Sequence, residues 1–187
     1  MRIISGKFKG KKLFLPKDKK TRPLKDIAKE SIFNLITHSK KINFEFKNSN
    51  ILDLFSGSGS FGLECFSREC KHVTFVESYK PAFDLLEKNV KSLNINKNYE
   101  IIKKDIYKEN FFSSINKNYN LIFFDPPFKD NKIQYLLSLI YENKILKKKG
   151  FIIFHRHKKV QDIIHKKFEI IESRIYGISN ICFLKLK

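Results

Sequence analysis

The sequence predicts a doubly wound α/β fold with a mainly parallel sheet. Three observations support this expectation. From residue 51 onward, short apolar runs alternate with helical patterns. A glycine-rich stretch directly follows the first of these runs, at residues 57–62. The run at residues 119–125 is continuously apolar, which is typical of a strand buried on both faces of a sheet.

Before this alternation we expect a β-ribbon and a helix. Residues 2–15 should form a two-stranded ribbon, broken at Gly6 and Gly10. Pro23 should open a helix, because proline suits the first helical turn. The apolar stripe of this helix should hold Ile27, Ala28, Ser31, Ile32, Leu35 and Ile36. Residues 38–50 read as a polar connection.

The elements that follow are expected in strict alternation. The strands should lie at 51–55, 72–77, 99–103, 119–125 and 151–155. The helices should lie at 60–68, 80–93, 130–146 and near 158–166. Two further strands, near 168–175 and 181–186, flank a hairpin turn at 177–180, so the last strand should insert antiparallel.

Length and composition limit the class of protein. A chain of 187 residues can bury a full core, and we assign residues 1–187 to one domain with a basic ribbon and helix (1–37) and a catalytic core (50–187). Three cysteines without metal-ligand spacing indicate a reducing, cytoplasmic location. No apolar stretch reaches the ~20 residues that span a bilayer, and the N-terminus lacks a signal-peptide segment. We expect a monomer without a metal or membrane contact.

The net charge of +19, from 38 basic and 19 acidic residues, favours a polyanionic partner. Nucleotide bias in the coding sequence is an alternative explanation, because most of these residues are Lys while Ile, Asn and Phe are also abundant. Bias does not explain why residues 1–25 are strongly basic and carry a single acid, Asp18. We interpret this segment as a phosphate-contacting surface rather than a merely solvated one. Its candidate RNA-binding residues are Lys7, Lys9, Lys11, Lys12 and Arg22.

The glycine-rich stretch predicts a cofactor site. Gly57, Gly59 and Gly62 match the G-x-G-x-x-G pattern, in which the backbone approaches a ligand at a helix N-terminus. A dehydrogenase that binds a pyrophosphate shares this pattern. Asp53 argues against it, because a carboxylate repels pyrophosphate but suits the cationic amino-acid end of S-adenosylmethionine. The loop residues expected to contact the cofactor are Phe55, Ser56, Gly57, Ser58 and Gly59.

Two acids at the ends of the next strands extend this site. Glu77 follows Gly57 by about 20 residues, the separation at which an acid binds the ribose hydroxyls. Asp105 should accept a hydrogen bond from the adenine amino group, with Ile106 against the ring. The plainer alternatives are a solvated acid at Glu77 and ordinary turn chemistry at Asp105.

The run Asp125-Pro126-Pro127-Phe128 ends the central strand and is the candidate catalytic motif. The prolines fix the backbone, which leaves the Pro126 carbonyl rigid. An amino group held by that carbonyl and by the Asp125 carboxylate would direct its lone pair at a methyl donor, so positioning supplies the rate. Asp125 would also border the cofactor. Phe128 would stack on a base removed from its helix or loop. The alternative is a strand-ending acid before a Pro-Pro turn, with Phe128 in the core.

The chain resembles the RsmD family, which methylates N2 of a guanine in bacterial small-subunit (16S) ribosomal RNA. The distinguishing match is the N-terminal run from Arg2 to Gly10. Further matches are Arg22-Pro23, Asp26, Lys29-Glu30, Ile32-Phe33-Asn34, the run 53–64, Ser67-Arg68, Glu77, Asn89 and the run 125–128. The resemblance implies a class I methyltransferase that uses S-adenosylmethionine and acts on ribosomal RNA or on the assembling small subunit.

The chain also departs from that family. Leu24 and Ile27 stand where the family has Thr and Arg, and His155-Arg156-His157 is more basic than its usual acidic counterpart. Two alternatives remain open. One is an amino-methyltransferase that acts on adenine N6 of DNA or RNA, or on a protein glutamine. The other is a non-catalytic RNA-binding module, against which the complete set of acids argues.

Overall fold

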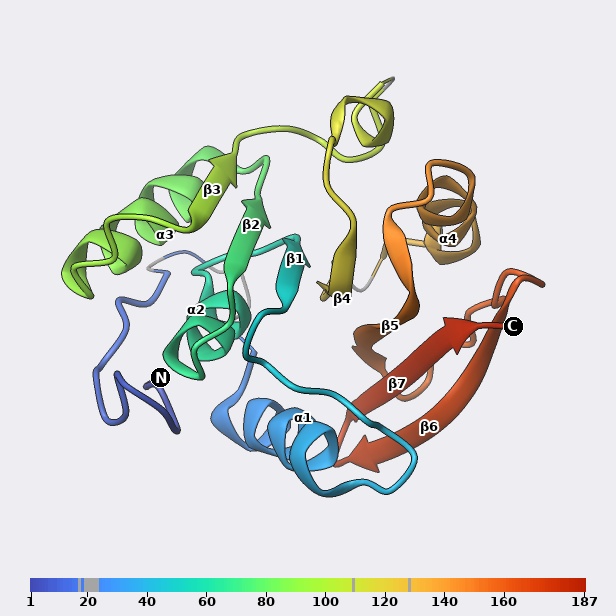
Figure 1. Cartoon of the computed structure of the whole chain (residues 1–187), viewed down its shortest axis with the longest axis horizontal. Helices are drawn as coiled ribbons and strands as arrows, with labels where there is room; N and C mark the ends of the chain where they lie inside the picture. Colours follow the sequence, from blue (N-terminus) through green and yellow to red (C-terminus); the bar gives the residue numbers. More distant parts are fainter. Residues whose placement is uncertain (17, 19–23, 109, 128) are drawn as a thin grey trace.

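We analysed a computed structural model of the chain (Figure 1). The structure describes residues 1–16, 18, 24–108, 110–127 and 129–187. Two residues of the sequence analysis, Arg22 and Phe128, lie outside the described residues, as does Pro23.

Among the described residues, seven strands form one sheet in the order β3-β2-β1-β4-β5-β7-β6 (Figure 1). The first five strands are β1 (Asn50–Leu54), β2 (His72–Val76), β3 (Tyr99–Ile102), β4 (Tyr119–Phe124) and β5 (Leu146–His157). They pair in parallel, whereas β7 (Ser179–Leu186) runs antiparallel to both β5 and β6 (Phe168–Tyr176). The predicted fold class and the antiparallel last strand are confirmed.

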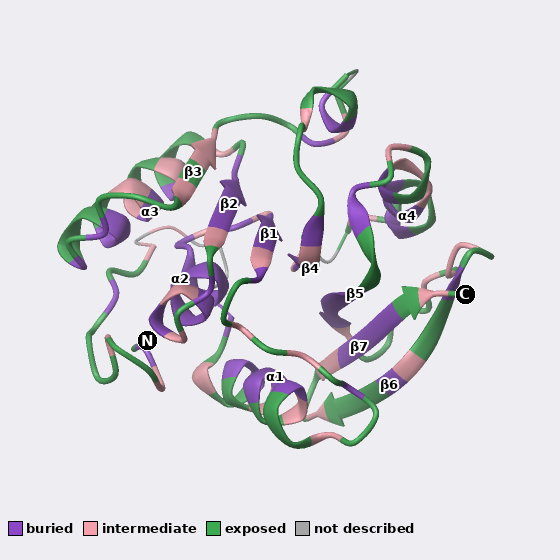
Figure 2. Ribbon diagram, viewed as in Figure 1, coloured by how far each residue is buried: buried purple, intermediate pink, exposed green. Residues whose placement is uncertain are grey.

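Helices cover both faces of this sheet. The helices are α1 (Asp26–His38), α2 (Ser60–Ser67), α3 (Lys80–Ser92) and α4 (Ile133–Glu142). Buried residues of the first three pack into one core cluster, and those of α4 pack into a second with a short 3₁₀ turn at Phe112–Ser114. Strand β4 is mostly buried (Figure 2). It contributes to both clusters, because Leu121 and Phe123 belong to the first and Ile122 and Phe124 to the second. The predicted burial of this strand on both faces is confirmed.

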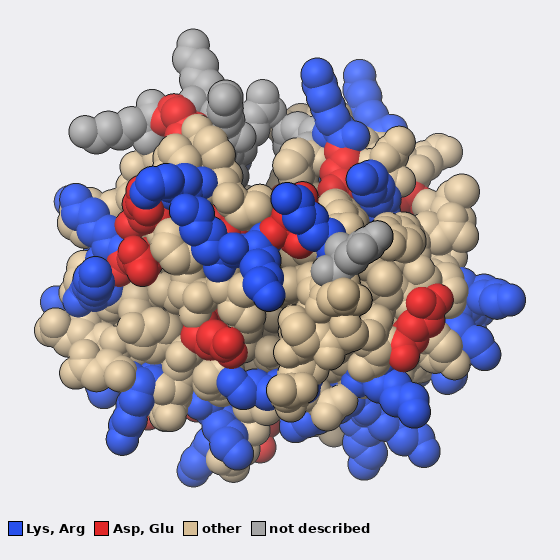
Figure 3. Space-filling model, turned by 90° about the horizontal axis from the view of Figure 1, so that it is seen from above, with Lys and Arg blue, Asp and Glu red and all other residues tan. Residues whose placement is uncertain are grey.

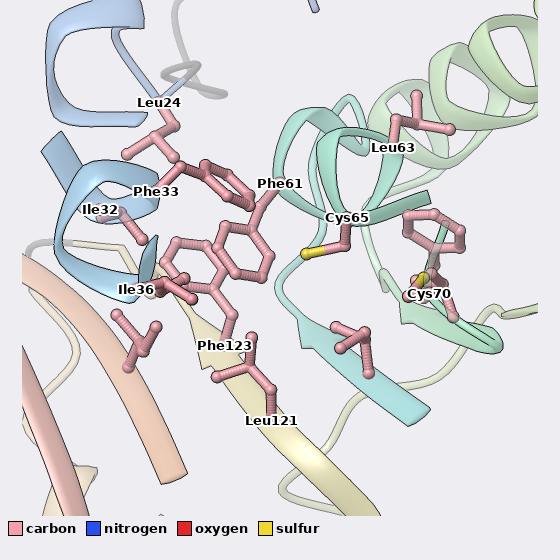
Figure 4. Close-up of a cluster of buried hydrophobic side chains, with 14 of the residues drawn as sticks. Leu24, Ile32, Phe33, Ile36, Phe61, Leu63, Cys65, Cys70, Leu121 and Phe123 are labelled. Carbon is pink, nitrogen blue, oxygen red and sulfur yellow. The ribbon is translucent and has the colours of Figure 1, made fainter. Parts of the chain in front are cut away.

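Stacked aromatic rings join α1, α2 and the centre of the sheet. The ring of Phe61 lies 3.9 Å from that of Phe123 and 5.2 Å from that of Phe33, measured between centroids (Figure 4). Phe61 follows the glycine loop directly, so this stack fixes the start of α2 against β4. The strand that precedes Asp125 is therefore held to this helix.

The connection between β1 and β4 positions the site. These strands are adjacent and parallel, with Leu54 opposite Phe124, although paired residues are 70 positions apart along the chain. The strand order reverses between them, and open α/β sheets bind ligands outside the carboxyl ends of strands at such a point. Residues just after Leu54 and Phe124 therefore face the expected ligand site.

The N-terminal ribbon is shorter than expected. Residues 1–13 form a tight hairpin with a single antiparallel bridge, Arg2 to Lys12. It is supported by backbone hydrogen bonds from the Ile3 amide to the Lys11 carbonyl and from the Gly10 amide to the Ile3 carbonyl. Helix α1 begins at Asp26. The prediction that Ile27 joins its apolar stripe is wrong, since this side chain is 71% exposed. Phe33, which was not in the predicted stripe, is buried in its place, so the buried face is rotated away from Ile27.

The prediction of a helix near residues 158–166 is wrong. This segment makes a turn at residues 158–159 and then runs without regular structure. The Lys158 amide continues the sheet by donating to the Ile178 carbonyl at 2.8 Å, and Asp162 is held by the buried Arg156. These contacts compete with helical hydrogen bonds, and Ile163 is left 69% exposed.

Helix α4 and strand β5 share a boundary that the sequence analysis placed too late. The helix ends at Glu142, and the strand already begins at Leu146, with an irregular register opposite Tyr119 and Leu121. Lys144 takes a positive φ of 52°, which breaks the helical path before Leu146. No helix within the described ranges is long and apolar enough to cross a membrane.

Candidate active site

The glycine loop joins the end of β1 to α2 in a tight left-handed path. Phe55, Gly57 and Gly59 have φ values of 56°, 55° and 77°, a region that favours glycine. A Cβ at Gly59 would overlap the Leu86 side chain, and one at Gly62 would overlap the ring of Phe75. The glycines therefore let α2 approach the sheet and α3 closely, as the G-x-G-x-x-G pattern requires.

Asp53 lies under the start of α2. Its side chain is almost fully buried, and one carboxylate oxygen accepts a hydrogen bond from the Gly62 amide at 3.0 Å. Burial, together with the nearby negative charges of Asp125 and Glu77, raises the pKa of Asp53 to about 8 against the opposing effect of the Gly62 hydrogen bond. A cation that binds beside such an acid stabilises its ionised form.

Glu77 connects the glycine loop to the next helix. It follows the last residue of β2 and is 8% exposed. One carboxylate oxygen accepts from the Gly57 amide at 2.8 Å, and the other accepts from the Tyr79 amide at 2.8 Å. Each oxygen keeps a second acceptor position, so the carboxylate can also receive hydroxyl donors. Contact with a ribose stays a prediction.

Asp125 follows the last residue of β4 and is paired with His155 of β5. Its Oδ1 lies 2.8 Å from the Nδ1 of His155, whose side chain is only 10% exposed. The Asp125 side chain is 18% exposed, so this carboxylate still reaches the surface of the site. His155 departs from the family pattern, and no role was predicted for it from the sequence. A polar side chain directly after the apolar run 151–154 was the available signal.

Arg156, the next residue of β5, holds the main chain of the Asp-Pro-Pro loop. This guanidinium is 1% exposed and pairs with Asp162 at 3.0 Å. It also donates to the carbonyl of Pro127 at 3.1 Å and to that of Asp130. Arg156 was not predicted as a site residue. The two carbonyls that it contacts lie 29 and 26 positions before it, and no sequence pattern links them to it.

Tyr107 adds a further support to this loop. Its hydroxyl donates to a carboxylate oxygen of Asp130 at 2.8 Å. Burial is the main cause that raises the pKa of the Tyr107 phenol, and this hydrogen bond raises it as well. The hydroxyl therefore remains a donor at neutral pH. The Pro127 carbonyl also accepts from the Asp130 amide at 2.8 Å. Pro126 is buried, and Pro127 is exposed.

Asp105 and Ile106 lie beyond the end of β3 and differ sharply in burial. Asp105 is exposed and accepts from the Tyr107 amide at 3.0 Å, whereas Ile106 is 3% exposed and belongs to the second core cluster. A pocket of about 560 Å³ opens beside Asp105, and it is lined by Ser78, Lys103, Lys104, Asp105, Lys108 and Phe111. The pocket begins next to Glu77 and does not include Asp53 or Asp125. Adenine recognition by Asp105 and Ile106 stays a prediction.

The N-terminal hairpin is anchored to α2, the helix that follows the glycine loop. The buried carboxylate of Glu64 accepts hydrogen bonds from the amides of Ile4 at 2.7 Å and Ser5 at 3.0 Å. The hydroxyl of Ser67 accepts from the Phe8 amide at 2.9 Å and donates to the Ser5 carbonyl. These motif residues were recognised only through resemblance, and the structure gives them a docking role.

Two more polar side chains complete the anchor. Asn89 of α3 accepts from the Phe14 amide at 2.8 Å and donates to the Ser58 carbonyl at 2.9 Å, so it links the hairpin to the glycine loop. Lys29 of α1 is fully buried, donates to the Arg2 carbonyl at 2.6 Å and lies 3.9 Å from Glu64. Burial lowers the pKa of Lys29, while Glu64 opposes this shift.

The predicted RNA-binding lysines lie on the outside of this hairpin. The side chains Lys7, Lys9, Lys11 and Lys12 are all exposed. Elsewhere, Lys and Arg side chains spread over the face seen in Figure 3, with smaller groups of acids between them. Within the described part of the chain, no group of three or more His, Cys, Asp or Glu side chains could hold a metal ion.

The fold is that of the class I methyltransferases. The Escherichia coli protein yhhF, described as a methyltransferase, superposes with a TM-score of 0.83 at 22% identity and covers 100% of this chain and 98% of its own. SMU.776, a structure solved in complex with SAH, superposes with a TM-score of 0.65 at 15% identity, covering 84% of this chain and 48% of its own. At these identities the likeness concerns the fold.

Sequence comparison defines the family. Residues 1–185 match the family described as "Conserved hypothetical protein 95". "Ribosomal RNA small subunit methyltransferase D" of Buchnera aphidicola is 35% identical over 173 residues, which cover 92% of this chain and 86% of the relative. This chain belongs to that family, the RsmD family, as its motifs predicted.

Proposed function

We propose that this protein transfers a methyl group from S-adenosylmethionine to the exocyclic N2 of a guanine in small-subunit (16S) ribosomal RNA. The observation that carries this proposal is the convergence of three acids. Asp53 is the penultimate residue of β1, and Glu77 and Asp125 directly follow the adjacent parallel strands β2 and β4. Burial, with the charges of Asp125 and Glu77, raises the pKa of Asp53. The family membership and the RNA-methylating relative support the substrate class.

The residues present fit S-adenosylmethionine. This cofactor carries an ammonium and a sulfonium, and such cations favour the ionised form of the buried Asp53, whose pKa is raised by burial and by the nearby Asp125 and Glu77. A dinucleotide would instead place its pyrophosphate beside Asp53, where the added negative charge would keep this acid neutral and leave it no electrostatic attraction to the ligand. Asp53, Glu77 and the loop at residues 55–59 would hold the cofactor, with Asp105 and Ile106 at its adenine end. The SAH-bound structure supports this assignment through its shared fold.

The chemistry required of the protein is mainly positioning. When bound, the cofactor supplies an electrophilic methyl group on a sulfonium. An oxygen of Asp125 would accept one N–H of the acceptor amine, and the carbonyl of Pro126 would accept the other. The Asp125 carboxylate would also stabilise the positive charge that develops on nitrogen until one N–H proton leaves to solvent, an electrostatic effect that is strong in a site sheltered from water. Phe128 remains the predicted stacking partner of the base.

Methyl transfer from labelled S-adenosylmethionine tests the proposal. The acceptors are small subunits and protein-free 16S rRNA from a strain that lacks this protein, and the modified nucleotide is mapped afterwards. We expect one labelled guanine carrying an N2-methyl group. Label on an adenine N6 would overturn the guanine assignment and keep the methyltransferase.

A separate binding experiment distinguishes an enzyme from a binding module. Calorimetric titration with S-adenosylmethionine should give a saturable signal from the wild-type protein, and a non-catalytic RNA-binding module should give none. Absence of both saturable binding and label in any RNA would overturn the proposed function as a whole.

A further inference from the structure

The pairing of Asp125 with His155 determines which atoms of the acid can receive a substrate. An ionised carboxylate only accepts hydrogen bonds, so the 2.8 Å contact requires a proton on Nδ1 of His155. Oδ1 of Asp125 is therefore already engaged. Among the described residues, His155 is the polar partner of this carboxylate, and Oδ2 is left for the acceptor amine.

The other nitrogen of this imidazole has a different environment. Nε2 of His155 is buried and has no hydrogen-bond partner among the residues that the structure describes. With its proton on Nδ1, the neutral ring places only a lone pair at Nε2, and no buried N–H is left unsatisfied there. His155 therefore fits as a fixed donor to Asp125.

Arg156 holds the backbone of the same loop independently of His155. It donates to the carbonyls of Pro127 and Asp130, whereas His155 contacts the side chain of Asp125. Consecutive strand residues point to opposite faces of a sheet, which lets the end of β5 contact the loop in both ways. Loss of His155 should therefore release the Asp125 carboxylate while the loop stays in place.

We propose that His155 is a positioning residue for methyl transfer, which fixes the Asp125 carboxylate through Nδ1–H so that Oδ2 faces the acceptor amine. This inference rests on the proposed function, and it adds a residue that acts on the acceptor through Asp125. It also explains how a basic strand end suits this site, since the strand supplies the donor that the carboxylate needs.

Three substitutions at one position test the inference. His155→Asn keeps an N–H donor near the position of Nδ1, His155→Gln moves the donor toward the position of Nε2, and His155→Leu removes it. His157→Leu, two residues along the same strand, is the matched control. Single-turnover methyl transfer is measured at saturating RNA and S-adenosylmethionine, beside the affinities for both and the melting temperature.

We expect His155→Leu to lower the methyl-transfer rate by about 10–100-fold, as is common when a group that orients a functional side chain is lost. Cofactor and RNA affinities should stay near wild type. His155→Asn should recover most of the rate, His155→Gln should recover less, and His157→Leu should match wild type. If His155→Leu does not fold, the order of Asn above Gln still tests the positioning role.

The failure of this inference differs from that of the proposed function. Wild-type rates in the Leu or Gln variant, with the wild-type protein active, would overturn the role of His155 alone. Equal rates of Asn and Gln variants, both far below wild type, would also overturn it. An inactive wild-type protein that does not bind S-adenosylmethionine would overturn the proposed function.

Discussion

The carboxylate of Asp53 accepts a hydrogen bond from the Gly62 amide at 3.0 Å, and it thereby joins the end of β1 to the first turn of α2. This acid is buried, and burial with the charges of Asp125 and Glu77 raises its pKa from 3.8 to about 8. The glycine loop is therefore built around a carboxyl group that is largely protonated at neutral pH when no cation is near.

Cofactor binding should consequently depend on pH. A cation beside Asp53 favours the ionised form, so binding at pH 7 should release a proton, and affinity should rise with pH until about pH 8. Calorimetry in two buffers of different ionisation enthalpy measures this release. Asp53→Asn, which cannot ionise, is the control and should release less. Equal proton release from wild type and Asp53→Asn would contradict the role given to Asp53.

Glu77 should matter for the loop as well as for the cofactor. Glu77→Ala leaves the amides of Gly57 and Tyr79 without their acceptor, and it should weaken S-adenosylmethionine binding by about 1–3 kcal/mol. Glu77→Gln keeps one acceptor oxygen and should lose less. Titration calorimetry checks both variants. Wild-type affinity in the Ala variant would show that this acid does not border the cofactor.

The docking of the hairpin on α2 predicts an effect of Ser67. Ser67→Ala removes the acceptor of the Phe8 amide and the donor to the Ser5 carbonyl. Hydrogen exchange of amides in residues 3–11 should become faster, while exchange in β1 and β4 stays unchanged. Ser113→Ala, a serine on the surface whose hydroxyl donates to the nearby Asn110 carbonyl, is the control. Unchanged exchange in the hairpin would argue against Ser67 as an anchor.

The exposed lysines of the hairpin should govern the salt dependence of RNA binding. If they contact phosphates, log affinity should fall with log salt by about 0.7 per contact on single strands. Replacing Lys7, Lys9, Lys11 and Lys12 together with Gln should flatten this slope and leave cofactor affinity unchanged. Replacing Lys147, Lys148 and Lys149 of β5, which are equally exposed, is the control. An equal slope in wild type and the hairpin variant would favour coding bias as the origin of the charge.

The parts of the fold that sequence analysis predicted are those with a local signal. The apolar run of β4 and the turn after Tyr176 required no distant partner. The parts that were predicted wrongly depend on contacts with other parts of the chain. Residues 158–166 follow a helical composition, yet their path is set by Asp162 binding the buried Arg156 and by Lys158 pairing with Ile178.

Site residues follow the same division. Asp53, Glu77 and Asp125 were identified because each lies near the end of an apolar run, and the structure places them at the carboxyl ends of adjacent strands. Contacts between residues far apart along the chain were not accessible. Glu64 lies 60 residues from Ile4, and His155 lies 30 residues from Asp125. No spacing rule links such pairs.

The substitution Asp125→Ala tests the central claim most directly. Methyl transfer is followed in a single turnover with RNA and S-adenosylmethionine at saturation, beside Asp125→Asn and the wild-type protein. Because Asp125 orients the acceptor amine, the Ala variant should lose turnover while it binds the cofactor almost as before. If the charge also contributes, the Asn variant should lose about 10²–10³ in kcat. Full activity in Asp125→Ala would remove this motif from the mechanism.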